Sequence, residues 1–206
     1  MNVVIDNQSG FTWKEDPPDV LTAVALISDF LRKRGRAILS VKTDGSTISP
    51  ESLVMTLQHK PMGDVALLEV TSEDVAALAG DSLNELEQVL PELSEACHRL
   101  SEVFQGESPD DGYEPFHHLA EIWRTVKERE ALIANALGVE LDAMEVNGTP
   151  IGLLHEELNA HLHAAAKGIE TRDCVLLGDL LEYELAPRAE AEAEIVALLR
   201  SHIPGR

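Results

Sequence analysis

The leucine-rich stretch at residues 83–104 is the feature that most constrains how this chain folds. Its apolar residues recur at alternating spacings of three and four: Leu83, Leu86, Leu90, Leu93, Cys97, Leu100 and Phe104. This periodicity places all of them on one side of an α-helix. Because a single helix with such a stripe gains its stability from packing, the stretch predicts a long helix covered by further helices.

Three more segments carry apolar residues with helical periodicity: residues 114–137, 149–169 and 171–199. Pro115 stands at the start of the first of these, where its missing backbone N–H is tolerated. We expect Thr149 to cap the second segment and Pro187 to bend the third. Four amphipathic helices with short connections favour an antiparallel arrangement. The pattern therefore predicts an antiparallel four-helix bundle over residues 72–206, with Ser72-Glu73-Asp74 capping its first helix.

The preceding residues carry short strand signals. The expected strands are residues 2–6, 11–13, 38–41, 47–48 and 65–70. Turns are expected at residues 7–10 and at Asp44-Gly45, a strong hairpin signal. A helix from residue 20 to 31 is capped by Asp19, and a short helical segment covers residues 49–57.

This order of elements resembles a ubiquitin-like β-grasp domain. The resemblance covers residues 1–71 and rests on the element order and the Asp44-Gly45 turn. It implies a fold and no particular activity. We therefore predict an α+β chain with two domains, a β-grasp domain at residues 1–71 and an acidic four-helix bundle at residues 72–206.

The net charge of −21 is concentrated in the predicted bundle. Residues 1–71 hold 7 basic and 9 acidic residues, whereas residues 72–206 hold 9 basic and 28 acidic residues. An acidic surface repels phosphate groups, so nucleic-acid and membrane partners are not expected. A basic or amphipathic helix of a protein partner fits this charge. We interpret the acidic run at residues 189–194 as a solvated helix face.

The two cysteines, Cys97 and Cys174, form neither a disulfide framework nor a metal motif. The first ten residues lack a basic segment followed by an apolar run, so we expect no secretory signal. Apolar runs are too short to span a bilayer. These features predict a soluble cytoplasmic protein.

Two Glu-x-x-His matches could hold a metal. Glu95 and His98 lie late in the first predicted helix of the bundle, and Glu114 and His117 lie at the start of the second. Di-iron bundles use this spacing, because it places both ligands on one face of a helix. They also need two further glutamates that project inward from other helices, and they place their Glu-x-x-His motifs on helices that are not consecutive. The remaining histidines, including His155 and His161, are interpreted as exposed or capping residues.

Four residues of the last helix form the candidate partner-binding surface: Asp179, Glu182, Tyr183 and Glu184. Spacings of three and four place Asp179 on the same face as Glu182 and Tyr183. Such a face could accept a basic side chain. The alternative is a polar network that fixes this helix against its neighbours, with Tyr183 bonding a buried backbone group.

Residues 173–185, Asp-Cys-Val-Leu-Leu-Gly-Asp-Leu-Leu-Glu-Tyr-Glu-Leu, resemble a segment of a bacterial family of uncharacterised proteins. Its members have a short β-rich part followed by acidic helices and a turn like Val146-Asn147-Gly148. The resemblance implies an unassigned function without known catalytic residues.

The chain contains no nucleophile elbow, P-loop, dinucleotide fingerprint or zincin motif. We therefore expect a non-enzymatic cytosolic protein-binding or adaptor protein without a cofactor or metal. An export chaperone that covers a client helix is a narrower form of this hypothesis. The alternatives are a metal-dependent bundle enzyme that uses the Glu-x-x-His pairs, and homodimerisation through uncovered apolar surface.

Overall fold

The computed structural model describes residues 1–204, which form two units: Met1–Leu78 and a second unit that begins at Ala79. The first unit contains a five-stranded sheet and the second is helical, so the predicted α+β class is confirmed at this level. The predicted boundary at residue 71 falls inside the last strand of the sheet, which continues to Asp74, and the first unit extends to Leu78. Each unit is described by itself.

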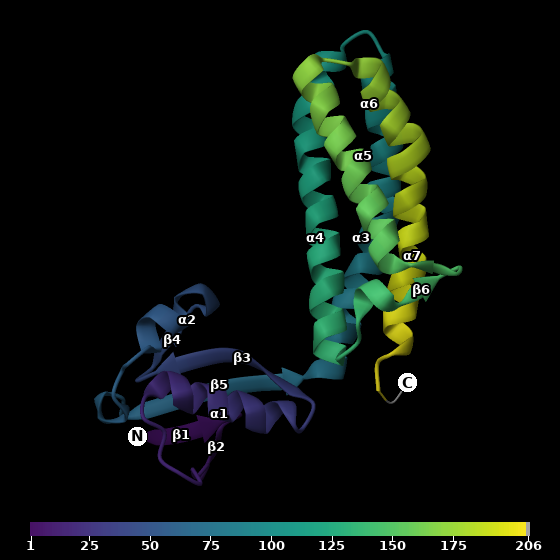
Figure 1. Ribbon diagram of the computed structural model, residues 1–206. Helices are drawn as coiled ribbons and strands as arrows, with labels where there is room; N and C mark the ends of the chain where they lie inside the picture. The colour runs from purple at the N-terminus through teal and green to yellow at the C-terminus, as the bar shows by residue number, and fades with distance from the viewer. Residues whose placement is uncertain (205–206) are drawn as a thin grey trace. The chain divides into compact units, whose positions relative to one another are not determined.

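The sheet of the first unit has the strand order β2-β1-β5-β3-β4. Its strands are β1 (Asn2–Ile5), β2 (Gln8–Ser9), β3 (Arg36–Thr43), β4 (Ser46–Ile48) and β5 (Leu67–Asp74). β1 and β5 are parallel, and the other three pairs are antiparallel. The remaining elements are helix α1 (Val20–Arg32), helix α2 (Pro50–Leu57) and the short 3-10 turn η1 (Met62–Asp64) (Figure 1).

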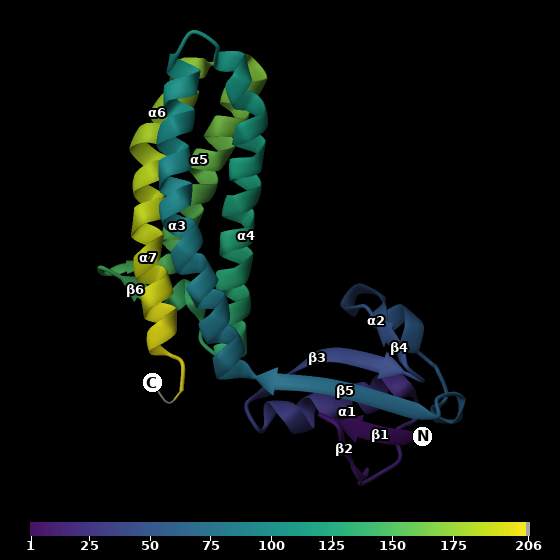
Figure 2. The ribbon, with the colours of Figure 1, turned by 180° about the vertical axis from the view of Figure 1, so that it is seen from behind.

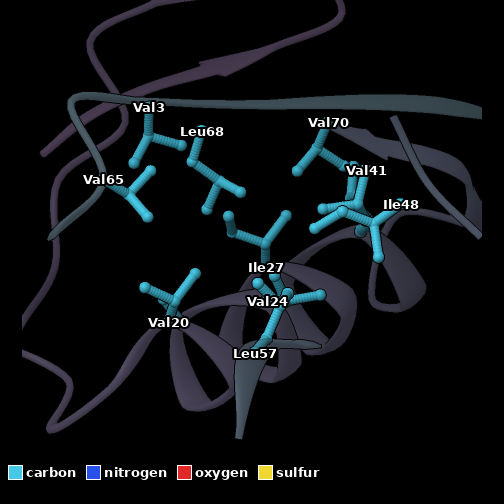
Figure 3. Packing of buried hydrophobic residues seen from close by; sticks show 12 residues of the cluster. Val3, Val20, Val24, Ile27, Val41, Ile48, Leu57, Val65, Leu68 and Val70 are labelled. Carbon is cyan, nitrogen blue, oxygen red and sulfur yellow. The ribbon is translucent and has the colours of Figure 1, made fainter. Parts of the chain in front are cut away.

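Apolar residues of α1 and the sheet form the core of this unit. Val20, Val24 and Ile27 of α1 face Leu68 and Val70 of β5 (Figure 3). The predicted cap of α1 is confirmed, because the Asp19 side chain accepts a hydrogen bond from the Thr22 backbone N–H at 2.8 Å. Alternate residues of β5 point inward, as a sheet with one covered face requires.

The two hairpins differ in how well the sequence predicted them. Asp44 and Gly45 have φ values of 50° and 82°, so the expected two-residue turn is confirmed. The predicted first hairpin is wrong: β2 is Gln8–Ser9, and residues 11–13 form no strand. Asp6 and Asn7 take φ values of 49° and 64°, which closes the turn several residues earlier.

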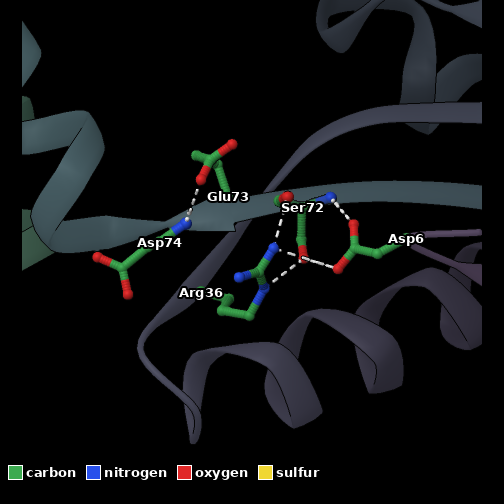
Figure 4. Close-up of polar contacts among 5 residues, drawn as sticks. All are labelled: Asp6, Arg36, Ser72, Glu73 and Asp74. Carbon is green, nitrogen blue, oxygen red and sulfur yellow. Dashed lines mark hydrogen bonds and ion pairs between the residues drawn. The ribbon is translucent and has the colours of Figure 1, made fainter.

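A polar network joins β1, β3 and β5 at the end of the first unit (Figure 4). The backbone N–H and the hydroxyl of Ser72 donate to the two carboxylate oxygens of Asp6, at 2.7 and 2.6 Å. Arg36 donates to the Ser72 hydroxyl and carbonyl, both at 2.8 Å, and to Asp6 at 3.2 Å. These hydrogen bonds, with those from Ser72 largest, hold the pKa of Asp6 below its ordinary value.

Ser72 is therefore a buried strand residue and not part of a helix cap. The cap is supplied by Asp74, whose side chain accepts a hydrogen bond from Ala77 N–H at 3.0 Å. The helix that follows is α3 (Val75–Gln105). All seven apolar residues of the predicted stripe are buried in it, so that prediction is confirmed. α3 continues through Pro91, which is exposed.

The other α-helices of the second unit are α4 (Tyr113–Leu137), α5 (Ile151–Thr171), the short α6 (Cys174–Leu180) and α7 (Ala186–Ser201). They run alongside α3 in both views (Figures 1 and 2). The connections contain the 3-10 turns η2 (Pro109–Gly112) and η3 (Leu141–Ala143) and a small hairpin of β6 (Glu145–Val146) and β7 (Thr149–Pro150). The predicted end of α4 is confirmed, because Gly138 adopts a left-handed conformation with φ 72°.

Two predicted details of these helices are wrong. Thr149 does not cap α5, because it pairs with Val146 in the small hairpin. The last helix is not simply bent at Pro187; a π-helical segment η4 (Leu181–Leu185) separates α6 from α7. There the Ala186 N–H donates to the Leu181 carbonyl five residues back. The next residue, Pro187, has no N–H to donate, so the wider π-helical turn lies where the regular hydrogen-bond pattern is interrupted.

No helix within residues 1–204 is both long enough and apolar enough to cross a membrane.

Replacing Asp6 by Asn tests the network of Figure 4. A carboxyl whose pKa is lowered by folding stabilises the folded state above its unfolded pKa of about 3.9, and this contribution is lost as the pH falls through the folded pKa. We expect D6N to lower the free energy of unfolding at pH 7 by about 1–2 kcal/mol. The difference from wild type should shrink below pH 4.

Urea denaturation followed by Trp13 fluorescence in a W123F background measures this effect, because the chain has two tryptophans. The exposed Asp16, changed to Asn, is the matched control. An equal loss in D16N, or a D6N deficit that persists unchanged at pH 3, would contradict the assignment.

Candidate functional site

A cluster of charged side chains lies inside the helical unit. Glu130 of α4 and Glu192 of α7 are fully buried, and the side chain of His155 of α5 is 12% exposed. The Nε2 atom of His155 lies 3.3 Å from Glu130 Oε2 and 3.7 Å from Glu192 Oε1. Three helices therefore bring two carboxylates and one imidazole to a common point.

Each of these residues occupies a position on the apolar face of its helix. Glu130 lies four residues after Val126, His155 lies four residues after Ile151, and Glu192 lies three residues before Ile195; all three apolar neighbours are buried. Since residues three or four apart share a helix face, the packing that buries the apolar stripes also buries the charged side chains.

Two cations lie beside the cluster. Arg188, 11% exposed, brings Nη2 to 2.5 Å from Glu192 Oε2, without the angles of a hydrogen bond. Lys127 donates to Asn159 Oδ1 at 3.0 Å, at the edge of the cluster. Burial lowers the pKa of Lys127, against the opposing effect of Glu192 and Glu130. The guanidinium thus offsets one carboxylate charge, while Glu130 has no comparable partner.

The environment shifts the pKa values of Glu130 and His155. Burial above all, helped by the negative charge of Glu192 and opposed by His155, raises the pKa of Glu130 to about 7. For His155, burial alone would lower the pKa, but the two neighbouring carboxylates outweigh it and raise the pKa. Both shifts favour retention of a proton between these two groups near neutral pH.

Two carboxylates and an imidazole are also a ligand set for a divalent transition-metal ion. The three ligand atoms lie within 4.8 Å of one another, and no other group of three His, Cys, Asp or Glu side chains in the described part of the chain meets this condition.

Sequence reasoning missed this cluster. The interpretation of residues 189–194 as a solvated face is wrong for Glu192, and the interpretation of His155 as an exposed or capping residue is also wrong. Glu130 was not a candidate. The available signal was the presence of an ionisable residue on an apolar stripe in each of three helices.

The residues of the two Glu-x-x-His matches do not gather at one site. His98 Nδ1 lies 2.9 Å from Glu182 Oε2, and Glu95 pairs with Arg99 of its own helix at 2.6 Å. Glu114 and His117 are exposed near the start of α4. None of the four belongs to the metal-capable group found within residues 1–204.

The four residues of the predicted partner surface do not face the same way. Asp179 and Tyr183 are exposed, and Tyr183 is 69% accessible. Glu182, however, contacts His98 of α3, whereas Glu184 Oε2 lies 3.6 Å from Nε2 of His161 in α5. The two glutamates therefore face different helices, and both have partners within the chain.

A groove open to solvent lies between α3 and α4. One part has a volume of about 740 Å³ and an adjoining part about 540 Å³; the two share Ala96, Arg99, His118 and Ile122. Its apolar lining includes Val89, Leu93, Ala96, Val103, Leu119 and Ile122. Ile122 is 40% exposed, so part of this lining faces solvent.

Charged residues border the groove. Arg129 and Glu85 pair across it, and Arg99 pairs with Glu95 along α3. Glu92 and Glu114 also line it, and neither pairs with another residue that the structure describes. The unpaired charge at the groove is therefore negative.

Removing the guanidinium beside Glu192 tests the energetics of the buried cluster. We expect R188M to lower the free energy of unfolding by about 3–5 kcal/mol, because it leaves a buried carboxylate without its cation. The double variant R188M/E192M should recover most of this loss, since it replaces the pair by apolar side chains of similar volume.

Urea denaturation followed by the fluorescence of buried Trp123 in a W13F background measures these changes. Arg124, exposed and paired with Glu121 and Glu128, gives the control R124M, for which we expect a loss below about 1 kcal/mol. A double variant as unstable as R188M would show that the pair itself is not the cause.

Comparison with known proteins gives one match. No curated protein and no solved structure matches the chain. A family model described as "Domain of unknown function (DUF8042)" matches residues 81–194, which is more than half of the chain and includes both the groove and the buried cluster. The expected relation to a family without an assigned function is thus confirmed at that level: the chain belongs to the DUF8042 family.

Proposed function

We propose that this protein is a non-enzymatic protein-binding adaptor whose helical unit receives an amphipathic helix of a partner in the groove between α3 and α4. The observation that carries the proposal is the mainly apolar lining of that groove, which both helices contribute. An amphipathic helix that lays its apolar face into such a groove is a common recognition mode. An export chaperone would be a narrower form of the same function.

The length of the groove fits a helix of several turns. Its lining on α3 extends from Leu86 to Val103. At a rise of 1.5 Å per residue, this is about 25 Å, or between four and five helical turns. A partner helix of about 17 residues would cover it and would bury Ile122, which is now partly exposed.

Charge favours a partner helix with basic flanks. Glu92 and Glu114 lie along the groove without ion pairs to other described residues, and residues 72–206 carry a net charge of −19. Basic side chains beside the apolar face of the partner would meet these carboxylates. Such complementarity accelerates association and orients the helix more than it adds affinity.

The proposal rests on a bundle of antiparallel helices. Glu85 near the start of α3 pairs with Arg129 late in α4, and Glu130, also late in α4, contacts His155 near the start of α5. These contacts support opposite directions for consecutive helices. For the first unit, the strand order β2-β1-β5-β3-β4 with a parallel central pair supports a ubiquitin-like β-grasp fold.

A synthetic helix tests the groove directly. We expect an 18-residue Leu/Lys peptide with one apolar face to bind the full chain, and I122K to weaken its affinity at least tenfold, equivalent to about 1.4 kcal/mol. The lysine places a charge on the apolar lining and repels the basic flanks. Fluorescence anisotropy at 0.5 M NaCl measures the affinity while screening non-specific attraction.

Leu132, 66% exposed on the same helix and outside the groove lining, provides the matched control L132K. A second control is a peptide of the same composition whose leucines are spread around the helix. If the scrambled peptide binds equally well, or if I122K and L132K behave alike, the groove is not the binding site.

A further inference from the structure

We infer that Glu130, His155 and Glu192 form a binding site for one divalent transition-metal ion. These residues differ from the Glu-x-x-His pairs that the sequence suggested, and they lie on α4, α5 and α7. The inference is independent of the proposed partner groove.

The distances between the side chains suit a single ion. Nε2 of His155 lies 3.3 Å from Glu130 Oε2 and 3.7 Å from Glu192 Oε1. A tetrahedral ion with bonds of about 2.0–2.1 Å places its ligand atoms roughly 3.3–3.5 Å apart. All three ligand atoms lie within 4.8 Å of one another, so rotations of these side chains would bring them to bonding distance of one ion.

The carboxylate of Glu130 supports the inference independently of these distances. Its side chain is fully buried, yet neither oxygen has a hydrogen-bond partner among the described residues. The nearest cationic group is the imidazole of His155, 3.3 Å away. Burial of a carboxylate without hydrogen bonds is strongly unfavourable, so such groups are normally hydrogen-bonded or bound to a metal. A cation placed between Glu130 and His155 would satisfy this group.

Arg188 has the position of an outer-shell residue. Its guanidinium contacts Oε2 of Glu192, which leaves Oε1 on the side of His155. Carboxylate ligands of metals are commonly oriented in this way by a second group. Arg188 also offsets part of the negative charge of the two glutamates. A divalent ion would bind the same atoms of Glu130 and His155 that hold the proton, so ion and proton would compete.

The ligand types restrict the ion. One imidazole and two carboxylates suit Mn²⁺, Fe²⁺, Co²⁺ or Zn²⁺, whereas Ca²⁺ and Mg²⁺ prefer oxygen ligands alone. Because the site joins three helices and is nearly closed to solvent, the bound ion would stabilise the folded unit. Zn²⁺, the strongest binder of these four by the usual order, is the appropriate probe.

The test uses the full chain with its affinity tag removed and stripped of metal by a chelator. We expect calorimetric titration with Zn²⁺ to give one equivalent, and saturating Zn²⁺ to raise the melting temperature by about 5 °C or more. Co²⁺ should give the visible absorption of a four- or five-coordinate ion with nitrogen and oxygen ligands.

The variants E130Q and E192Q should each weaken Zn²⁺ binding at least 100-fold and abolish the thermal shift. E130Q keeps the shape of the side chain and removes a buried charge, so the metal-free variant should remain folded by circular dichroism. Exposed Glu128 on the same helix gives the control E128Q, which should bind Zn²⁺ as wild type does.

Two results would overturn the inference. If wild type binds no Zn²⁺, a shared proton is the occupant of the cluster. If E130Q binds Zn²⁺ as well as wild type does, the ion binds surface carboxylates instead. Binding of the Leu/Lys peptide should be the same in E130Q and wild type. The outcome for the metal site is therefore separate from the outcome for the groove.

Discussion

Burial of apolar helix stripes is the constraint on which the helical unit depends. The seven residues from Leu83 to Phe104 are all buried, and the Ser101 hydroxyl, next to Leu100, donates to the carbonyl of Gly178 in α6 at 3.0 Å. A helix of 31 residues with such a stripe gains its stability from packing, so further helices must lie beside it. Their registers then decide which polar residues are forced inside.

The charged cluster is a consequence of this packing. Glu130, His155 and Glu192 occupy stripe positions, so they enter the interior together with Val126, Ile151 and Ile195. Burying two carboxylates opposes folding unless they are compensated. Arg188 compensates one of them, and a proton or a divalent ion between Glu130 and His155 would compensate the other. Apolar residues at these positions would avoid this cost, which makes the cluster a strong candidate for a function.

The groove between α3 and α4 is apolar and open to solvent, whereas the cluster is charged and buried. Its apolar lining is left partly open, as the 40% exposure of Ile122 shows, and the carboxylates at its border are solvated. In the surface expected from the sequence, around Asp179 and Tyr183, the two glutamates already contact histidines. The open apolar groove, between α3 and α4, and the closed charged cluster, on α4, α5 and α7, therefore share only helix α4.

Local signals in the sequence determined where most elements begin and end: Asp19 caps α1, Asp44-Gly45 forms a turn, Gly138 ends α4, and the leucine periodicity defines α3. Each of these depends on a few neighbouring residues. The meeting of Glu130, His155 and Glu192 was decided only by the tertiary structure, because it depends on the relative registers of three helices. The turn at Asp6-Asn7 was missed for a similar reason: Asp6 bonds with Ser72, 66 residues away, and no local pattern encodes that contact.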